Sequence, residues 1–225
     1  MLTVRQLKTI ALLTVSLSLL SWIKISSFVG AAAAGFSLSH CFSPLIGLLA
    51  GGIGAMAFFC IRTCVHVGMA TTLPAFVFAC HLPTLAAALY LSSLNKAHYT
   101  IDFTKKLLIA LIPLSCIALF CIHPTGSQAW AYSLLWTIPL ATLFSNHLFA
   151  HMLGSTFTAH AVGSVVWLYC GPVLTPALWL ALIPVALLER ITMASGMTLA
   201  YYGLSALSQT TYTQKFVSFF TSQRA

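Results

Sequence analysis

Acidic side chains are almost absent from this chain of 225 residues, which contains only Asp102 and Glu189. Charged residues of both signs make up 5% of the sequence, whereas hydrophobic residues make up 60%. A water-exposed protein surface is normally about a quarter charged. The composition therefore excludes an ordinary soluble domain and predicts a single integral membrane domain over residues 1–225.

The shortage of acids also narrows the chemistry. Paired-carboxylate catalysis is disfavoured, because Asp102 lies in a basic loop between two apolar blocks. The ten basic residues give a net charge of +8, and most of them flank apolar blocks, where such residues contact lipid phosphates and set the topology. We therefore expect these charges to meet the lipid bilayer and no nucleic acid. The seven cysteines are scattered through apolar runs and predict no disulfide framework.

Long apolar blocks dominate what the sequence does contain. A helix needs about 20 residues to cross a bilayer core. Breaks at Pro, Gly or polar residues delimit blocks near 8–28, 44–62, 68–94, 106–122, 128–148, 150–170 and 174–207. The fold class is therefore all-α, a polytopic transmembrane helical bundle of about six to seven spans. The segment 29–43 is apolar but short and precedes Pro44, which favours a re-entrant piece and widens the range to six to eight.

Two of these stretches are too long for simple spans. Residues 128–169 would reach about 63 Å as one helix, twice the hydrocarbon thickness, so the chain must fold back. The polar run Ser145-Asn146-His147 is the expected turning point. The last block would reach about 50 Å and contains Pro184, so we expect it to be either tilted and projecting or broken.

The richest polar region begins at this expected turn. On one helix His147, His151 and Thr158 would share a face. His160 would lie on the opposite side, so ligation of a metal by three histidines would require a break in the helix. Polar groups at membrane depth usually face a bundle interior or a water-filled cavity. The pattern therefore predicts a solute pocket, and the alternative is that these groups hydrogen-bond one another and join helices. Whether a metal binds here is unknown from the sequence.

Glu189 and Arg190 form the one charged pair within the last apolar block. Neighbouring side chains leave a helix about 100° apart, so the two are not expected to face each other. A charge in mid-membrane is costly unless it is paired. We therefore favour a role in function or partner docking, with a helix end at the headgroups as the alternative.

Aromatic residues bracket the later blocks. Trp130, Tyr132 and Trp136 stand at one end, and Trp167, Tyr169 and Trp179 stand near the next turn. An interfacial aromatic belt is the favoured interpretation, and a stacking surface formed by Trp167 and Tyr169 is the alternative. The complete set of candidate solute-binding residues is Asn146, His147, His151, Thr158, His160, Trp167, Tyr169, Glu189 and Arg190.

Small residues recur at four-residue spacing in the second block. Gly47 pairs with Gly51, and Ala50 pairs with Gly54. Such positions let helix backbones approach closely in lipid. Packing within the chain is the favoured interpretation, and packing against a partner protein is the alternative.

The segment FSLSHCFSPLIGLLAGGIGA, residues 36–55, resembles the entry to the second helix of the substrate-binding S components of energy-coupling factor vitamin transporters. Chain length, basic balance and the near absence of acids are also similar, and the resemblance extends over residues 10–205. It implies a bundle that captures a vitamin-like or metal-related solute. A transmembrane coupling subunit with ATPases would then carry the solute across the bacterial cytoplasmic membrane. No cofactor is expected, and the chain has no ATP-binding motif of its own.

Two other functions stay open. An intramembrane metal-dependent or serine/histidine enzyme would require His147, His151 and His160 to converge within about 5 Å. A membrane scaffold would use its polar groups only to join helices. We expect a transporter subunit rather than an enzyme.

Overall fold

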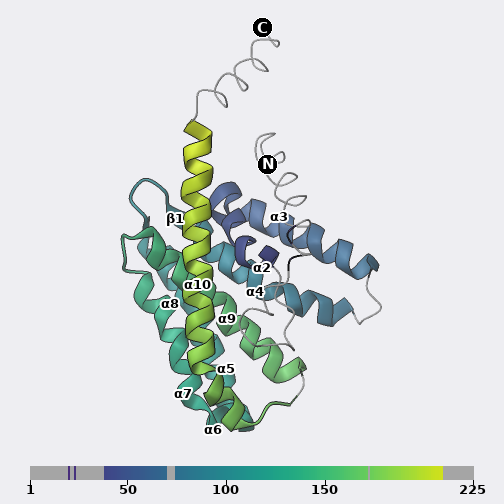
Figure 1. Cartoon of the computed structure of the whole chain (residues 1–225). Coiled ribbons are helices and arrows are strands. Elements are labelled where there is room, and N and C mark those ends of the chain that lie inside the picture. The colour runs from purple at the N-terminus through teal and green to yellow at the C-terminus, as the bar shows by residue number, and fades with distance from the viewer. Residues whose placement is uncertain (1–19, 21–22, 24–37, 70–73, 172, 210–225) are drawn as a thin grey trace.

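The computed structural model describes residues 20, 23, 38–69, 74–171 and 173–209, and those residues form a bundle of helices (Figure 1). The predicted first span, 8–28, lies almost wholly outside them. Of the predicted re-entrant segment only the end is described, where the short helix α2 covers Leu38–Phe42.

Helix α3, Leu45–Met69, begins directly after Pro44 and packs along α4, Pro74–Ser92. A side-chain carbon at Gly47 would overlap the backbone carbonyl of Ala88 on α4, so the two helix backbones touch there. The predicted packing of small residues within the chain is confirmed at this position. Gly51 does not pack against another helix in this way. Its φ of 75° makes a kink inside α3, and glycine adopts this backbone conformation without strain.

A two-stranded antiparallel hairpin follows α4 and was not predicted. It pairs β1, Leu94–Asn95, with β2, Thr100–Ile101. Helix α5, Phe103–Ile122, then starts one residue after Asp102, whose carboxylate lies 3.0 Å from the Lys105 ammonium group on the exposed surface.

The predicted span 128–148 does not form one continuous helix. Side-chain hydroxyls of Ser133, Thr137 and Thr142 each donate to the carbonyl three residues earlier, and Pro139 lacks a backbone N–H, so the chain tightens and breaks. The predicted turn at 145–147 is confirmed, because α9 begins at Leu148. The short elements before it are α6 (Pro124–Gln128), α7 (Trp130–Ser133), the 3₁₀ helix η2 (Leu134–Trp136) and α8 (Thr137–Thr142).

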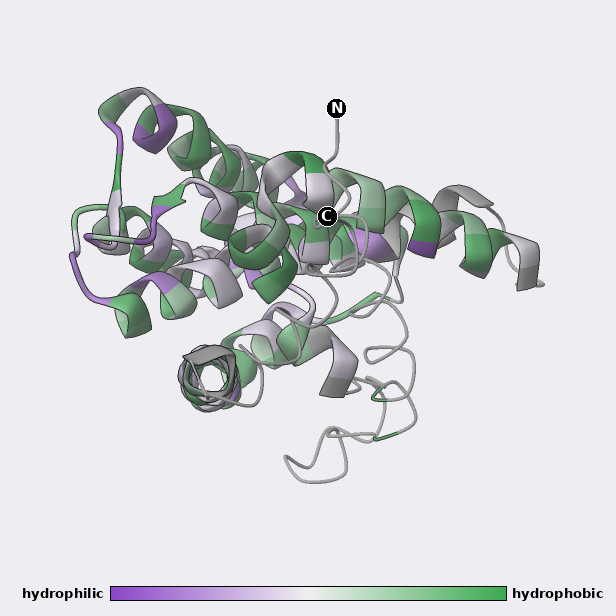
Figure 2. Ribbon diagram, turned by 90° about the horizontal axis from the view of Figure 1, so that it is seen from above, coloured by the Kyte–Doolittle hydropathy of each residue, from purple (hydrophilic) through white to green (hydrophobic). Residues whose placement is uncertain are grey.

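Helix α9, Leu148–Cys170, packs against α4, α5, α8 and α10 and so occupies the middle of the bundle. Helix α10, Pro176–Gln209, runs for 34 residues without a break despite Pro184. Its C-terminal end projects beyond the other helices (Figure 1), as the tilted and projecting alternative predicted. Most of the helical ribbon is hydrophobic (Figure 2).

Three helices in the described part of the chain are long and apolar enough to cross a membrane. They cover Leu45–Val65, Phe103–Ile122 and Pro176–Ala206. Large apolar side chains such as Leu108 and Leu111 on α5 are exposed, and apolar surface of this kind matches a hydrocarbon environment. The structure is therefore consistent with an integral membrane protein.

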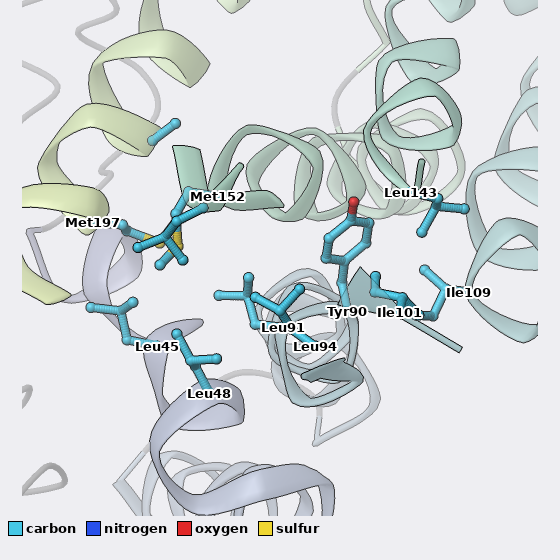
Figure 3. Packing of buried hydrophobic residues seen from close by; sticks show 12 residues of the cluster. Leu45, Leu48, Tyr90, Leu91, Leu94, Ile101, Ile109, Leu143, Met152 and Met197 are labelled. Carbon is cyan, nitrogen blue, oxygen red and sulfur yellow. The ribbon is translucent and has the colours of Figure 1, made fainter. Parts of the chain in front are cut away.

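One core cluster joins α3, α4, α5, α9, α10 and the hairpin (Figure 3). In it Leu48 of α3 and Leu91 of α4 lie near Met152 of α9 and Met197 of α10. Tyr90 is wholly buried in the same cluster, and its hydroxyl points toward α9. A buried phenol needs a polar partner, so the core contains a polar junction.

A second core cluster is aromatic. The ring centroids of Tyr132, Trp136 and Trp179 lie 5.7, 5.1 and 5.3 Å from that of Phe120, and all four residues are buried. The belt interpretation is wrong for Tyr132, Trp136 and Trp179, because their rings pack against Phe120 inside the bundle. Trp130, Trp167 and Tyr169 are exposed, as a belt requires.

Candidate functional site

His151 is completely buried at the point where α9 meets the turn 143–147 and the hairpin. Its Nε2 lies 2.8 Å from the Tyr99 carbonyl oxygen and 2.9 Å from the Ser145 carbonyl oxygen. Carbonyl oxygens only accept, so Nε2 carries a proton and donates to both. Desolvation, with Tyr201 and Tyr202 nearby, raises the pKa of the Tyr99 hydroxyl above its ordinary value.

The other nitrogen of His151 faces the hydroxyl of Tyr90 at 3.4 Å. That hydroxyl also lies 2.8 Å from Thr142 Oγ1, and Thr142 donates to the Pro139 carbonyl. The junction fits only because Gly154 has no side chain, since a Cβ there would overlap Thr142 Oγ1 and the Tyr90 hydroxyl. We call His151, Tyr90 and Thr142 the His151 junction.

His160 is the centre of a second set of hydrogen bonds, one helix turn from Ser164. The Trp136 indole N–H can only donate, and it donates to His160 Nδ1 at 3.3 Å. His160 Nε2 therefore carries the proton of the neutral ring and donates to the Tyr132 hydroxyl at 2.8 Å, which lies 3.4 Å from Ser164 Oγ. We call these four residues the His160 network. Both ring nitrogens are occupied, so His160 offers no lone pair to activate a serine.

Glu189 and Arg190 contact each other, contrary to prediction. Arg190 Nη2 lies 3.1 Å from Glu189 Oε2, and the two side chains are 7% and 14% exposed. Long side chains at neighbouring positions can bend along the helix surface until their charged ends meet. The attraction between opposite charges is stronger where little water surrounds them. Thr156 of α9 donates to the Arg190 carbonyl at 3.4 Å, which ties the pair to α9.

The other candidate residues do not gather with the histidines. Asn146 and His147 are exposed at the start of α9, and Trp167 and Tyr169 are exposed near its end. Tyr169 donates to the Leu119 carbonyl at 2.8 Å. Thr158 is buried, and its hydroxyl donates to the Gly154 carbonyl within α9. The nine residues therefore fall into separate places along α9 and α10, and their binding of a solute stays a prediction.

The metal-dependent alternative finds no support among the residues that the structure describes, where no group of three His, Cys, Asp or Glu side chains is placed to hold a metal ion. His151 and His160 belong to different hydrogen-bonded sets, and His147 is exposed.

A small cavity lies elsewhere, between α3 and α4. Its volume of about 10 Å³ is the room of one water molecule. Arg62 of α3 and His81 and Thr84 of α4 supply its polar lining, and the rest is apolar, with Ala55 and Phe58 among the residues. None of the nine predicted residues borders it. The signal that could have identified it is Arg62 itself, a single arginine near the end of a predicted span.

Arg62 reaches from α3 back to α2 and the turn after it. Its Nη1 donates to Ser43 Oγ at 3.1 Å and its Nη2 donates to Ser39 Oγ at 3.3 Å. Its guanidinium carbon lies 6.0 Å from the centre of the Phe58 ring, at the outer limit of a cation–π contact. We call the cavity together with Arg62, Ser39 and Ser43 the Arg62 cleft.

No protein-family model, curated protein or solved structure matches this chain.

Proposed function

We propose that this protein is the solute-binding subunit of a membrane transporter, which holds a small solute inside its helical bundle and passes it on with partner subunits. The observation that supports this best is the Arg62 cleft, where a guanidinium, an imidazole and the hydroxyl of Thr84 border a cavity between apolar helices. Convergent polar groups in an apolar pocket are the usual form of a small-molecule site. Polar residues at membrane depth commonly mark a substrate path.

We propose that the chain crosses the membrane about six times. By length alone, α9 with 23 residues reaches about 35 Å and α4 with 19 residues reaches about 28 Å. Added to the three apolar helices and the predicted span at 8–28, they make six. This number lies within the six to seven spans that the apolar blocks of the sequence predict.

The cavity is too small for a vitamin-sized solute as it stands, since such pockets measure about 300–1,000 Å³. Binding would therefore require α3 and α4 to separate. The kink at Gly51 divides α3 into two parts, and the part that carries Arg62 follows the kink. We propose that this outer part of α3 moves away from α4 to admit the solute.

A scaffold is the second candidate, and it has its own support. The His151 junction and the His160 network satisfy their polar groups largely from within the chain and join α4, α7, η2, α8 and α9. A protein whose polar residues did nothing more than this would need no solute. The serine/histidine enzyme has no comparable support, because both nitrogens of His160 are occupied.

The test is to purify the whole protein in lipid nanodiscs and to identify bound small molecules and companion subunits by native mass spectrometry. The transporter proposal predicts a solute at one copy per chain. An Ala55→Leu variant, which fills the cavity, should lose this solute, whereas Ala118→Leu on the exposed face of α5 should retain it. Thermal unfolding of both variants shows whether they are folded. A wild-type protein that carries neither solute nor companion subunit would favour the scaffold.

A further inference from the structure

No acidic side chain in the described part of the chain pairs with the positive charge of Arg62. The sequence contains two acidic side chains. Within the described residues, Asp102 pairs with Lys105 at 3.0 Å and Glu189 pairs with Arg190 at 3.1 Å. Both carboxylates are therefore engaged elsewhere, on α5 and on α10. A counter-ion for Arg62 has to come from outside the side chains of the protein.

The surroundings of Arg62 make such a counter-ion valuable. The side chain is partly buried on an apolar helix, and it contacts the hydroxyls of Ser39 and Ser43 and the ring of Phe58. Hydroxyls and rings can orient a guanidinium, but they carry no net negative charge. A charge among apolar groups is unfavourable unless an opposite charge accompanies it.

The wall opposite Arg62 suits an anion. His81 of α4 is 5% exposed and borders the same cavity, as does the hydroxyl-bearing Thr84. The Phe59 ring, which also borders the cavity, meets His81 in a T-shaped contact with the ring centres 6.5 Å apart. Guanidinium, imidazole and hydroxyl groups can all donate hydrogen bonds, and the planar arginine fork matches the two oxygens of a carboxylate or phosphate.

We propose that the Arg62 cleft, with His81, binds the anionic group of a ligand, a phosphate or a carboxylate. As a statement about the transported solute, this inference rests on the proposed function and names the solute as an anion. A lipid headgroup offers the same phosphate chemistry at a membrane surface, so the test has one arm for each source.

The first arm uses inorganic phosphate and the whole protein in an uncharged maltoside detergent. Phosphate should raise the thermal unfolding midpoint by about 2–5 °C more than chloride at equal ionic strength, because it binds the folded protein. Arg62→Gln should lose this excess, and Arg62→Lys should keep part of it. Lys105→Gln removes an exposed charge on α5 and should keep all of it. Midpoints in chloride alone show that each variant is folded.

The second arm replaces phosphate with lipid in mixed micelles. Phosphatidylglycerol is compared with phosphatidylcholine in the same four proteins. An effect of phosphatidylglycerol that depends on Arg62, without an effect of phosphate, assigns the cleft to a lipid headgroup and confirms the anion site. An effect of phosphate that depends on Arg62 assigns it to a soluble anion.

The inference is overturned if neither probe stabilises the wild-type protein, or if Arg62→Gln responds as the wild type does. It is also overturned if the solute found by native mass spectrometry is uncharged and stays bound to Arg62→Gln. That last result would leave the transporter proposal standing. The converse result, phosphate binding without any companion subunit or solute, would leave the anion site standing and remove the transporter proposal.

Discussion

The His160 network and the Arg62 cleft hold polar side chains in the same apolar bundle and differ in how these are satisfied. His160 meets a hydroxyl and an indole N–H of its own chain, and its neutral ring needs nothing further. Arg62 also donates hydrogen bonds to hydroxyls of its own chain, but these neutral groups do not neutralise its positive charge. The comparison teaches that hydrogen bonds alone can complete a neutral group in a membrane protein. A charge needs an opposite charge as well.

The largest effect on stability is expected at the Glu189–Arg190 pair, where both charges are nearly buried and neutralise each other. Arg190→Met should destabilise the protein by about 3 kcal/mol, because it leaves a nearly buried carboxylate without its charged partner. Denaturant unfolding in detergent micelles measures the loss. The double variant Glu189→Gln, Arg190→Met should recover most of it, since both charges are then gone. A double variant as unstable as the single one would mean that the pair matters through other contacts.

Gly154 tests whether the His151 junction is closely packed. Gly154→Ala should cost about 2 kcal/mol, because the added carbon would overlap Thr142 Oγ1 and the Tyr90 hydroxyl. Gly203→Ala on α10 is the matched control, since an added carbon there meets nothing within 4 Å. The same unfolding measurement applies. Equal stability of the two variants would show that the junction is looser than the structure indicates.

His151 tests the hydrogen bonds themselves. His151→Leu should cost about 1–2 kcal/mol, because the carbonyls of Tyr99 and Ser145 lose a shared donor in a buried place. His147→Leu makes the same chemical change on an exposed position of the same segment and should have little effect. If His151→Leu abolished solute binding while the protein stayed folded, the predicted pocket at 145–160 would replace the Arg62 cleft.

Arg62 should show the smallest effect on stability. In anion-free detergent, Arg62→Met should change the free energy of unfolding by no more than about 0.5 kcal/mol. The lost hydrogen bonds to serine hydroxyls are offset by removal of a poorly solvated charge. The unfolding measurement is repeated with phosphate, where only the wild type should gain. A large loss for Arg62→Met in anion-free detergent would instead make Arg62 part of the structural framework.

Sequence reasoning located helices better than it located contacts. The helices at 103–122 and 148–170 and the turn before Leu148 follow from apolar length and a polar break. The predicted span at 128–148 is also rich in apolar residues, but serine and threonine hydroxyls and Pro139 divide its helix into short pieces. The length of an apolar run indicates how readily a segment enters lipid. It does not show where a side-chain hydroxyl will bond to the backbone and interrupt the helix.

The sequence by itself predicted an integral membrane protein, because two acidic side chains and long apolar blocks do not make an ordinary water-exposed surface, and three long apolar helices are consistent with that prediction. It also determined that Arg62 could find few acidic partners. Only the tertiary structure decided which polar groups meet, since the contacts of His160 with Tyr132 and of Arg62 with Ser39 cross 28 and 23 positions of the sequence. Such contacts depend on how the helices pack. The spacing of residues along one helix shows which of them share a face, but it does not show which face of another helix lies opposite.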